Sequence, residues 1–160
     1  MRSRFAGKAS PVHFFWGSFD LSVTFFSGRA APLHPGGMVN CPDWVMHEAY
    51  SREVSSAGYW PGGAEEGIFY AYAYPEPTDY RLQPVGPDAE FSTGLGEYIL
   101  PYRAVRMAEG PDAVLDRFLT STYAAAAVQG GWGVDLLSRS ESASPPWSLA
   151  QTIRESRPAQ

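Results

Sequence analysis

Residues 10–28, SPVHFFWGSFDLSVTFFSG, alternate between apolar and polar side chains. Gly17 apart, the odd positions from Phe15 to Phe25 are apolar, and the even positions from Ser18 to Thr24 are polar. Successive side chains of a strand point to opposite faces, so the pattern predicts one long central strand with a buried face and an open face. Because strands usually have about 5 or 6 residues, Gly17 is expected to mark a bend or bulge.

The same patterns predict the remaining elements. Residues 67–74, GIFYAYAY, form a strand with tyrosines on one face and a small alanine face that could lie under a helix. Short strands are expected at residues 89–93 and 97–102, around a glycine turn. A helix with an apolar stripe begins near Pro111 and stops at Gly130. The segment between the first two long strands is read as loops around one short helix, residues 43–54.

Composition narrows the class of protein. The chain has 160 residues, 44% of them hydrophobic, a net charge of −5 and one cysteine, Cys41. We expect a single α+β domain over residues 1–137, with an antiparallel sheet of about three to five strands and the C-terminal helix on one face. The Ser- and Pro-rich residues 138–160 read as a disordered tail. Scattered basic residues argue against nucleic acid, and the lack of a long apolar run argues against a membrane span and favours the cytoplasm.

The first candidate site is the open face of the long strand, with Trp16, Ser18 and Asp20 at successive outward positions and His13 upstream. A histidine beside a carboxylate can act as a general base or as a metal ligand next to an aromatic platform. Strand parity, however, puts His13 on the face opposite Asp20 unless a bulge at Gly17 shifts the register. The other interpretation is a capped strand end with a solvated polar face.

The second candidate site is the segment 48–60. As a lid, it would bring Glu53 with Ser55 or Ser56 to the open face, with Tyr59 nearby and Tyr72 on the tyrosine row. Alternatively, Glu48 and Arg52 form a helical surface pair and the serines end a helix. The spacings of His34, Cys41 and His47 match no zinc pattern, so no metal site is predicted, and the glycine-rich pieces lack the frame of a phosphate loop.

Four stretches resemble a known protein family. They are SRFAGKASPVHFFWGSFDLSVTFFSGR at 3–29, EAYSREVSSAGYWPGG at 48–63, FYAYAYPEP at 69–77 and LGEYILPYRAVR at 95–106. Over residues 2–137 the chain resembles the C-terminal half of an uncharacterised bacterial family, domain of unknown function 5996. The resemblance implies a shortened member that lacks an N-terminal half covering the sheet. It also leads us to expect an arginine-type residue where His47 stands, and it carries no activity or cofactor.

Two functions therefore stay open. The first is a module that binds a small ligand or serves a structural role, with Trp16, Ser18, Ser55, Tyr59 and Tyr72 as ligand-binding candidates. The second is a small-molecule enzyme that uses His13, Asp20 and Glu53 as acid–base groups, which requires these side chains to converge within about 4–6 Å. The expected partners are a small-molecule ligand or a subunit that covers the missing N-terminal half.

Overall fold

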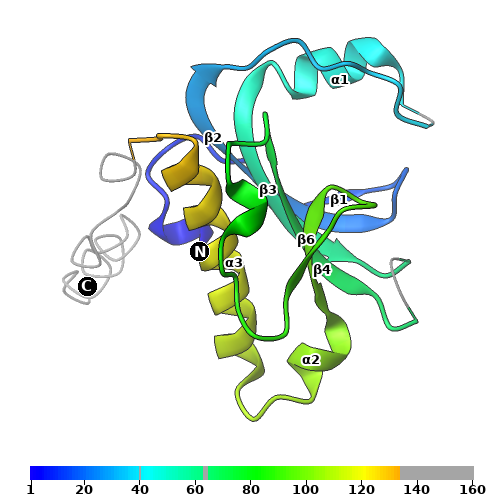
Figure 1. Ribbon diagram of the computed structural model, residues 1–160. Coiled ribbons are helices and arrows are strands. Elements are labelled where there is room, and N and C mark those ends of the chain that lie inside the picture. Colours follow the sequence, from blue (N-terminus) through cyan, green and yellow to red (C-terminus); the bar gives the residue numbers. More distant parts are fainter. Residues whose placement is uncertain (40, 63–64, 134–160) are drawn as a thin grey trace, which may run out of the picture.

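Six antiparallel strands form one sheet in the order β1-β2-β3-β4-β6-β5 (Figure 1). The computed structural model describes residues 1–39, 41–62 and 65–133. The strands are β1 (His13–Phe15), β2 (Asp20–Ala30), β3 (Arg52–Trp60), β4 (Ile68–Tyr74), β5 (Glu90–Ser92) and β6 (Glu97–Pro101). The α-helices are α1 (Asp43–Ala49), α2 (Tyr102–Arg106) and α3 (Pro111–Gln129), and short 3-10 turns occur at η1 (Arg2–Arg4) and η2 (Tyr80–Leu82). The predicted α+β class is confirmed, with a larger sheet than the three to five strands expected.

The alternating stretch at residues 10–28 is a hairpin, and the prediction of one long strand is wrong. The chain turns at residues 16–19 and returns as β2, pairing Phe15 with Asp20 and His13 with Ser22. Phe19 adopts a left-handed backbone conformation (φ 62°), and its amide donates to the Phe15 carbonyl at 2.7 Å. Alternation cannot distinguish one long strand from two strands joined by a turn. A four-residue turn keeps the same alternation of apolar and polar positions on both sides of it.

The third strand lies where the sequence suggested the end of a helix and a loop. Helix α1 ends at Ala49, and Arg52–Trp60 forms β3 in the middle of the sheet. The stretch has few large aliphatic side chains, so its strand character comes from pairing with β2 and β4 on both sides. The interpretation of residues 48–60 as a lid is therefore wrong.

Helix α3 packs on one face of the sheet and forms the main core. The alanines of β4 lie beneath it as predicted, with Ala71 buried against Ala126 of the helix in the same cluster. Tyr98 and Leu100 of β6 and Phe118 of α3 complete the centre of this core. Small side chains at the contact let the helix approach the strands closely. The helix begins at Pro111 and ends at Gln129, close to the predicted bounds.

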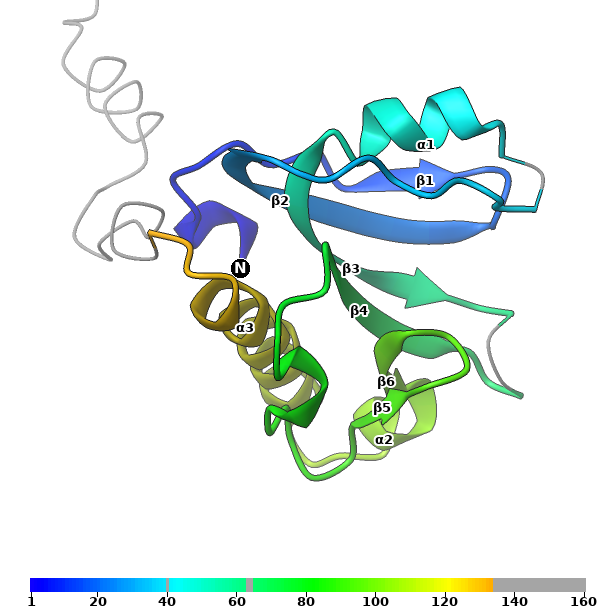
Figure 2. The same ribbon diagram turned by 45° about the horizontal axis from the view of Figure 1, so that its top comes forward.

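The opposite face, which we call the open face, carries Asp20, Ser22, Ser56, Tyr70 and Tyr72 from adjacent strands. Figure 2 shows α3 and α1 on opposite sides of the sheet. The segment that contains α1 covers one end of the open face, where the hydroxyl of Tyr74 donates to the Pro32 carbonyl at 3.1 Å. Farther along the same face, Asp20, Ser22 and Tyr70 are buried, whereas His13 and Phe15 of β1 are exposed. The expected tail at residues 138–160 lies outside the described residues.

Candidate functional site

Asp20 is the first residue of the site and the first residue of β2. Its side chain is buried, with 7% of its surface exposed. One carboxylate oxygen accepts a hydrogen bond from the hydroxyl of Ser18, and the other accepts one from the hydroxyl of Tyr70. The hairpin turn supplies the first donor and strand β4 the second. Two charge-assisted hydrogen bonds therefore fix the orientation of this carboxylate.

Gly58 explains how Tyr70 reaches Asp20 across an intervening strand. In the sheet, Gly58 of β3 pairs with Ser22 on one side and with Tyr70 on the other. A Cβ atom at this position would meet the Tyr70 hydroxyl at 2.7 Å and the Ser22 Cβ at 2.8 Å. Because glycine has no side chain, the Tyr70 ring can lie across β3 with its hydroxyl on β2.

The tyrosines of β4 continue the site along the sheet. The rings of Tyr70 and Tyr72 stack with their centroids 6.3 Å apart, and the Tyr72 hydroxyl lies 2.7 Å from the Tyr50 hydroxyl. The imidazole of His34 stacks on Tyr50 with 4.7 Å between centroids. Burial raises the pKa of Tyr50 and of Tyr70, and it raises the pKa of Tyr72 to about 12. These phenols are therefore neutral near pH 7 and can both donate and accept hydrogen bonds.

Glu97 on β6 is the second carboxyl group of the site. It alternates with Tyr98, which points into the core beneath α3, so Glu97 belongs to the open face. The side chain is partly buried and makes no hydrogen bond among the described residues. Burial, followed by the charge of Asp20, raises the pKa of Glu97 to about 7. A carboxyl group with such a pKa can take up and release a proton near neutral pH.

No cation neutralises either carboxyl group within the described part of the chain. The four ion pairs found there lie elsewhere and are Arg4–Asp116, Arg29–Glu53, Arg81–Glu76 and Arg106–Glu66. We use the name open-face polar cluster for Ser18, Asp20, Tyr50, Tyr70, Tyr72 and Glu97. This cluster joins two carboxyl groups to neutral hydroxyls, an arrangement suited to binding hydrogen-bond donors or to moving a proton.

His13 and Asp20 share the open face, contrary to the parity argument from the sequence. The turn at residues 16–19 reverses the chain, so the pairing of His13 with Ser22 puts both residues on the side that carries Asp20. His13 is exposed, and its ring packs edge-on against Phe15 with 4.8 Å between centroids. Trp16 lies in the turn with 81% of its surface exposed. Its assignment as a ligand contact stays a prediction.

Glu53, Ser55 and Tyr59 are on the face covered by α3, so the expectation that Glu53 and Ser55 reach the open face is wrong. The Glu53 carboxylate accepts hydrogen bonds from Arg29 at 2.7 Å and from Ser27 at 2.9 Å. Ser55 is buried. The Tyr59 hydroxyl donates to the Glu66 carbonyl at 3.2 Å. The physical reason is strand parity, since odd positions of β3 face the helix and Ser56 is the one candidate residue of this strand at an even position, on the face of Asp20.

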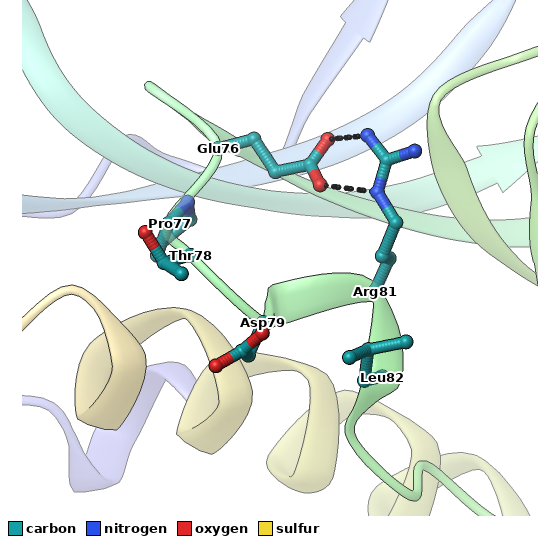
Figure 3. Close-up of a pocket in the computed structure, with 6 residues that line it drawn as sticks. All are labelled: Glu76, Pro77, Thr78, Asp79, Arg81 and Leu82. Carbon is teal, nitrogen blue, oxygen red and sulfur yellow. Dashed lines mark hydrogen bonds and ion pairs between the residues drawn. The ribbon is translucent and has the colours of Figure 1, made fainter.

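Two depressions on the surface lie away from the open-face polar cluster. One, of about 410 Å³, is lined by Glu76, Thr78, Asp79, Arg81 and neighbouring residues (Figure 3). The guanidinium of Arg81 donates to both oxygens of Glu76 at 2.8 and 2.9 Å, so the charges there satisfy each other. The other, of about 260 Å³, lies between the end of α3 and the chain after β4, and Glu53 is part of its wall.

Sequence reasoning missed Glu97 and Tyr50. The strand at residues 97–102 was predicted, and its alternation already separates Glu97 from Tyr98 and Leu100. Nothing in the sequence says that β6 lies beside β4, which is the pairing that brings Glu97 to the tyrosine row. Tyr50 comes from the segment that crosses the open face, so its contact with Tyr72 depends on the tertiary fold.

Other features of the described residues bear on the kind of site. No three side chains among His, Cys, Asp and Glu gather there to hold a metal ion. The ring of His34 accepts a hydrogen bond from the Gly36 amide at 3.0 Å. Within the same ranges, no helix is long and apolar enough to cross a membrane.

Comparison with known proteins gives a family and no activity. No curated protein and no solved structure matches the chain. A family model, the family of unknown function DUF5996, matches residues 1–139. The match covers nearly the whole chain and does not support a restriction to the C-terminal half of the family. On this match, the chain belongs to the DUF5996 family.

Proposed function

We propose that the open-face polar cluster binds a small polar ligand and that the chain acts as a ligand-binding module. The observation that supports this most directly is Glu97, a partly buried carboxyl group whose pKa responds to the charge of Asp20 and which has no hydrogen-bond partner in the described residues. A poorly solvated carboxyl group gains most from a partner that donates hydrogen bonds. A ligand with hydroxyl or amino groups would supply such donors.

The neighbouring groups favour the same class of ligand. Asp20 is held in place by Ser18 and Tyr70, so its carboxylate is organised before any ligand arrives. Tyr50 and Tyr72 present hydroxyls that can adapt as donor or acceptor. A rigid set of polar groups lowers the entropy that a ligand loses on binding.

A second function, a small-molecule enzyme, is favoured by one observation. The pKa of Glu97 is raised to about 7, the range in which a general acid or base works best near neutral pH. In this proposal Glu97 takes the acid–base role that the sequence assigned to Glu53. Asp20 and the tyrosine hydroxyls would orient the substrate, with His13 at the exposed edge of the face.

A thermal-shift screen tests both functions, with amino acids, polyamines, monosaccharides and hydroxy acids as the probes. Glu97→Gln keeps the shape of the side chain and removes its charge. Glu90→Gln is the matched control, because Glu90 is an exposed glutamate on the neighbouring strand β5. We expect a compound that raises the Tm of the wild type and of Glu90→Gln but not that of Glu97→Gln.

The outcomes separate the proposals. A compound that still stabilises Glu97→Gln to the same extent would contradict binding at this cluster. Incubation of the stabilising compound with the wild type, followed by mass spectrometry, distinguishes the functions, since a bound but unchanged compound supports the module and a converted one supports the enzyme.

We also propose that longer members of the family cover part of the open face with an N-terminal half or a separate subunit. The exposure of His13 and Phe15, the residues of β1 that share the open face, supports this proposal. The same screen on a longer family member tests it: a compound that stabilises only the longer protein would place the site between the two parts. Identical results for both proteins would contradict it.

A further inference from the structure

A cavity of about 260 Å³ lies between the C-terminal end of α3 and the chain that follows β4, and no residue of the open-face polar cluster lines it. Its apolar lining includes Ala73, Pro75, Pro77, Ala126 and Trp132. Because a water molecule takes up about 30 Å³ in the liquid, the cavity has room for a molecule of several heavy atoms. Apolar walls with a few polar groups between them are typical of small-molecule sites.

Glu53 is the carboxylate in the lining of this cavity that keeps one oxygen without a donor. Its Oε2 accepts hydrogen bonds from Ser27 at 2.9 Å and from Arg29 at 2.9 and 2.7 Å. Its Oε1 accepts none among the described residues, and the side chain is only 18% exposed. Glu76, by contrast, uses both oxygens on Arg81. A poorly hydrated carboxylate oxygen gains most from a ligand that donates hydrogen bonds.

The surroundings of Glu53 favour a cation as this donor. No lysine, arginine or histidine lines the cavity within the described part of the chain. Gln129 and Gly130 place the C-terminal end of α3 in the wall, and this end of a helix is the negative end of its dipole. Arg29 donates to the carbonyls of Gly130 and Gly131, the latter at 3.1 Å, and so holds the helix end in place relative to Glu53.

The indole of Trp132 brings a hydrogen-bond donor to the same cavity. Trp132 is 8% exposed, and its Nε1–H donates to no described residue. The nitrogen lies next to Gly130 in the cavity wall, because a Cβ at Gly130 would meet it at 2.9 Å. Since an indole N–H can only donate, it favours a neutral acceptor on the ligand, such as a carbonyl oxygen. The cavity therefore combines an acceptor at Glu53 with a donor at Trp132.

We propose that this cavity binds a small primary amine whose ammonium group lies next to a neutral hydrogen-bond acceptor. The ammonium group donates to Oε1 of Glu53, the acceptor receives the N–H of Trp132, and the hydrocarbon part packs against Ala73 and Ala126. A carboxylate beside the ammonium group would bring a negative charge to the negative end of α3, so free amino acids are excluded. The site shares no residue with the open-face polar cluster and is independent of the function proposed there.

Isothermal titration calorimetry of the full chain with three matched compounds tests the class of ligand. L-Alaninamide has the ammonium group and a neutral carbonyl, propionamide lacks the ammonium group, and L-alanine has a carboxylate in place of the amide. We expect L-alaninamide to bind and the other two compounds not to bind at the same concentrations. Absence of binding by L-alaninamide would overturn the proposal, as would equal affinity for propionamide or for L-alanine.

Two substitutions locate the binding. Glu53→Gln keeps the shape of the side chain and removes its charge, so the affinity for L-alaninamide should fall about tenfold or more. Trp132→Phe keeps an aromatic ring and removes the N–H, with an expected loss of about two- to tenfold. Glu90→Gln is the matched control and should bind like the wild type, because Glu90 is exposed on β5 and does not line the cavity.

Far-UV circular dichroism shows whether each variant is folded, since Glu53→Gln also weakens the pairing with Arg29. If Glu53→Gln does not fold, Trp132→Phe decides the outcome. Wild-type affinity in a folded Glu53→Gln protein or in Trp132→Phe would overturn the site. Binding that is lost in Glu97→Gln and kept in Glu53→Gln would place L-alaninamide in the open-face polar cluster and would likewise overturn it.

Discussion

At the scale of single residues, Glu97 is a carboxyl group whose burial disfavours its ionised form. Its ordinary pKa of 4.5 applies to the unfolded chain, whereas burial and the charge of Asp20 raise the pKa to about 7 in the folded protein. Between these two values the folded state binds more protons than the unfolded state, so stability falls as the pH rises. Above about pH 7 the full cost of the ionised group is present.

The Glu97→Gln variant tests whether ionisation of Glu97 lowers the stability of the fold. We expect the wild type to lose stability between pH 5 and pH 8 by an amount on the order of 2 to 3 kcal/mol, with a much flatter profile in the variant. Urea denaturation at both pH values gives the free energies of unfolding. Glu66→Gln is the control, because pairing with Arg106 lowers the pKa of the half-buried Glu66 and leaves that group ionised throughout this range. Equal slopes in the wild type and Glu97→Gln would refute the assignment.

The candidate residues show what a sequence can say about a site. Alternation correctly put Asp20 and Tyr72 on polar strand faces, because each lies in a strand that the pattern itself identifies. It misplaces Glu53, because residues 52–60 show no clear apolar period and resemble the end of a helix followed by a loop, whereas they form β3. It passed over Glu97, whose role arises only from the pairing of β6 with β4. The sheet order is therefore the missing information, and local patterns do not contain it.

At the scale of elements, the hairpin and the tyrosine strand are tied together across β3. The turn at residues 16–19 brings Ser18 to Asp20, and Tyr70 reaches the same carboxylate from β4. The alternation of apolar and polar residues predicts strands in both stretches but not the turn. A turn of four residues does not interrupt that alternation. The fold class could nevertheless be predicted from the sequence. The small alanine face of β4 and the apolar stripe of α3 are two surfaces that can pack together, and they do so in the main core.

Gly58 is the position where this link between elements can be broken. In Gly58→Ala the new Cβ meets the Leu21 carbonyl, the Tyr70 hydroxyl at 2.7 Å and the Ser22 Cβ at 2.8 Å, so the strands or the tyrosine must move. We expect a loss of about 1–3 kcal/mol in the free energy of unfolding, as is usual for overpacking. Urea denaturation measures it, with Gly94→Ala as a control at a site where a Cβ has open space. A Gly58→Ala protein as stable as the wild type would show that Tyr70 does not need the gap.

At the scale of the whole molecule, the two faces of the sheet have different tasks. The face under α3 holds the main core, with Phe118, Tyr98 and Leu100 at no more than 2% exposure. The open face holds the carboxyl groups and hydroxyls of the open-face polar cluster. Because apolar burial is the dominant favourable term in folding, we expect stability to depend chiefly on the α3 face.

Phe118→Ala tests this division. Phe118 is 1% exposed and packs in the cluster of Ala57, Ala71 and Leu100, so its removal leaves a cavity beneath the helix. We expect a loss of about 3–5 kcal/mol in the free energy of unfolding, measured by urea denaturation at pH 7. Leu82→Ala, at a side chain that is 73% exposed in η2, should change the stability by less than about 0.5 kcal/mol. Similar losses of unfolding free energy in both variants would contradict the assignment of the α3 face as the principal core. The open face would then also have to contribute to the stability of the fold.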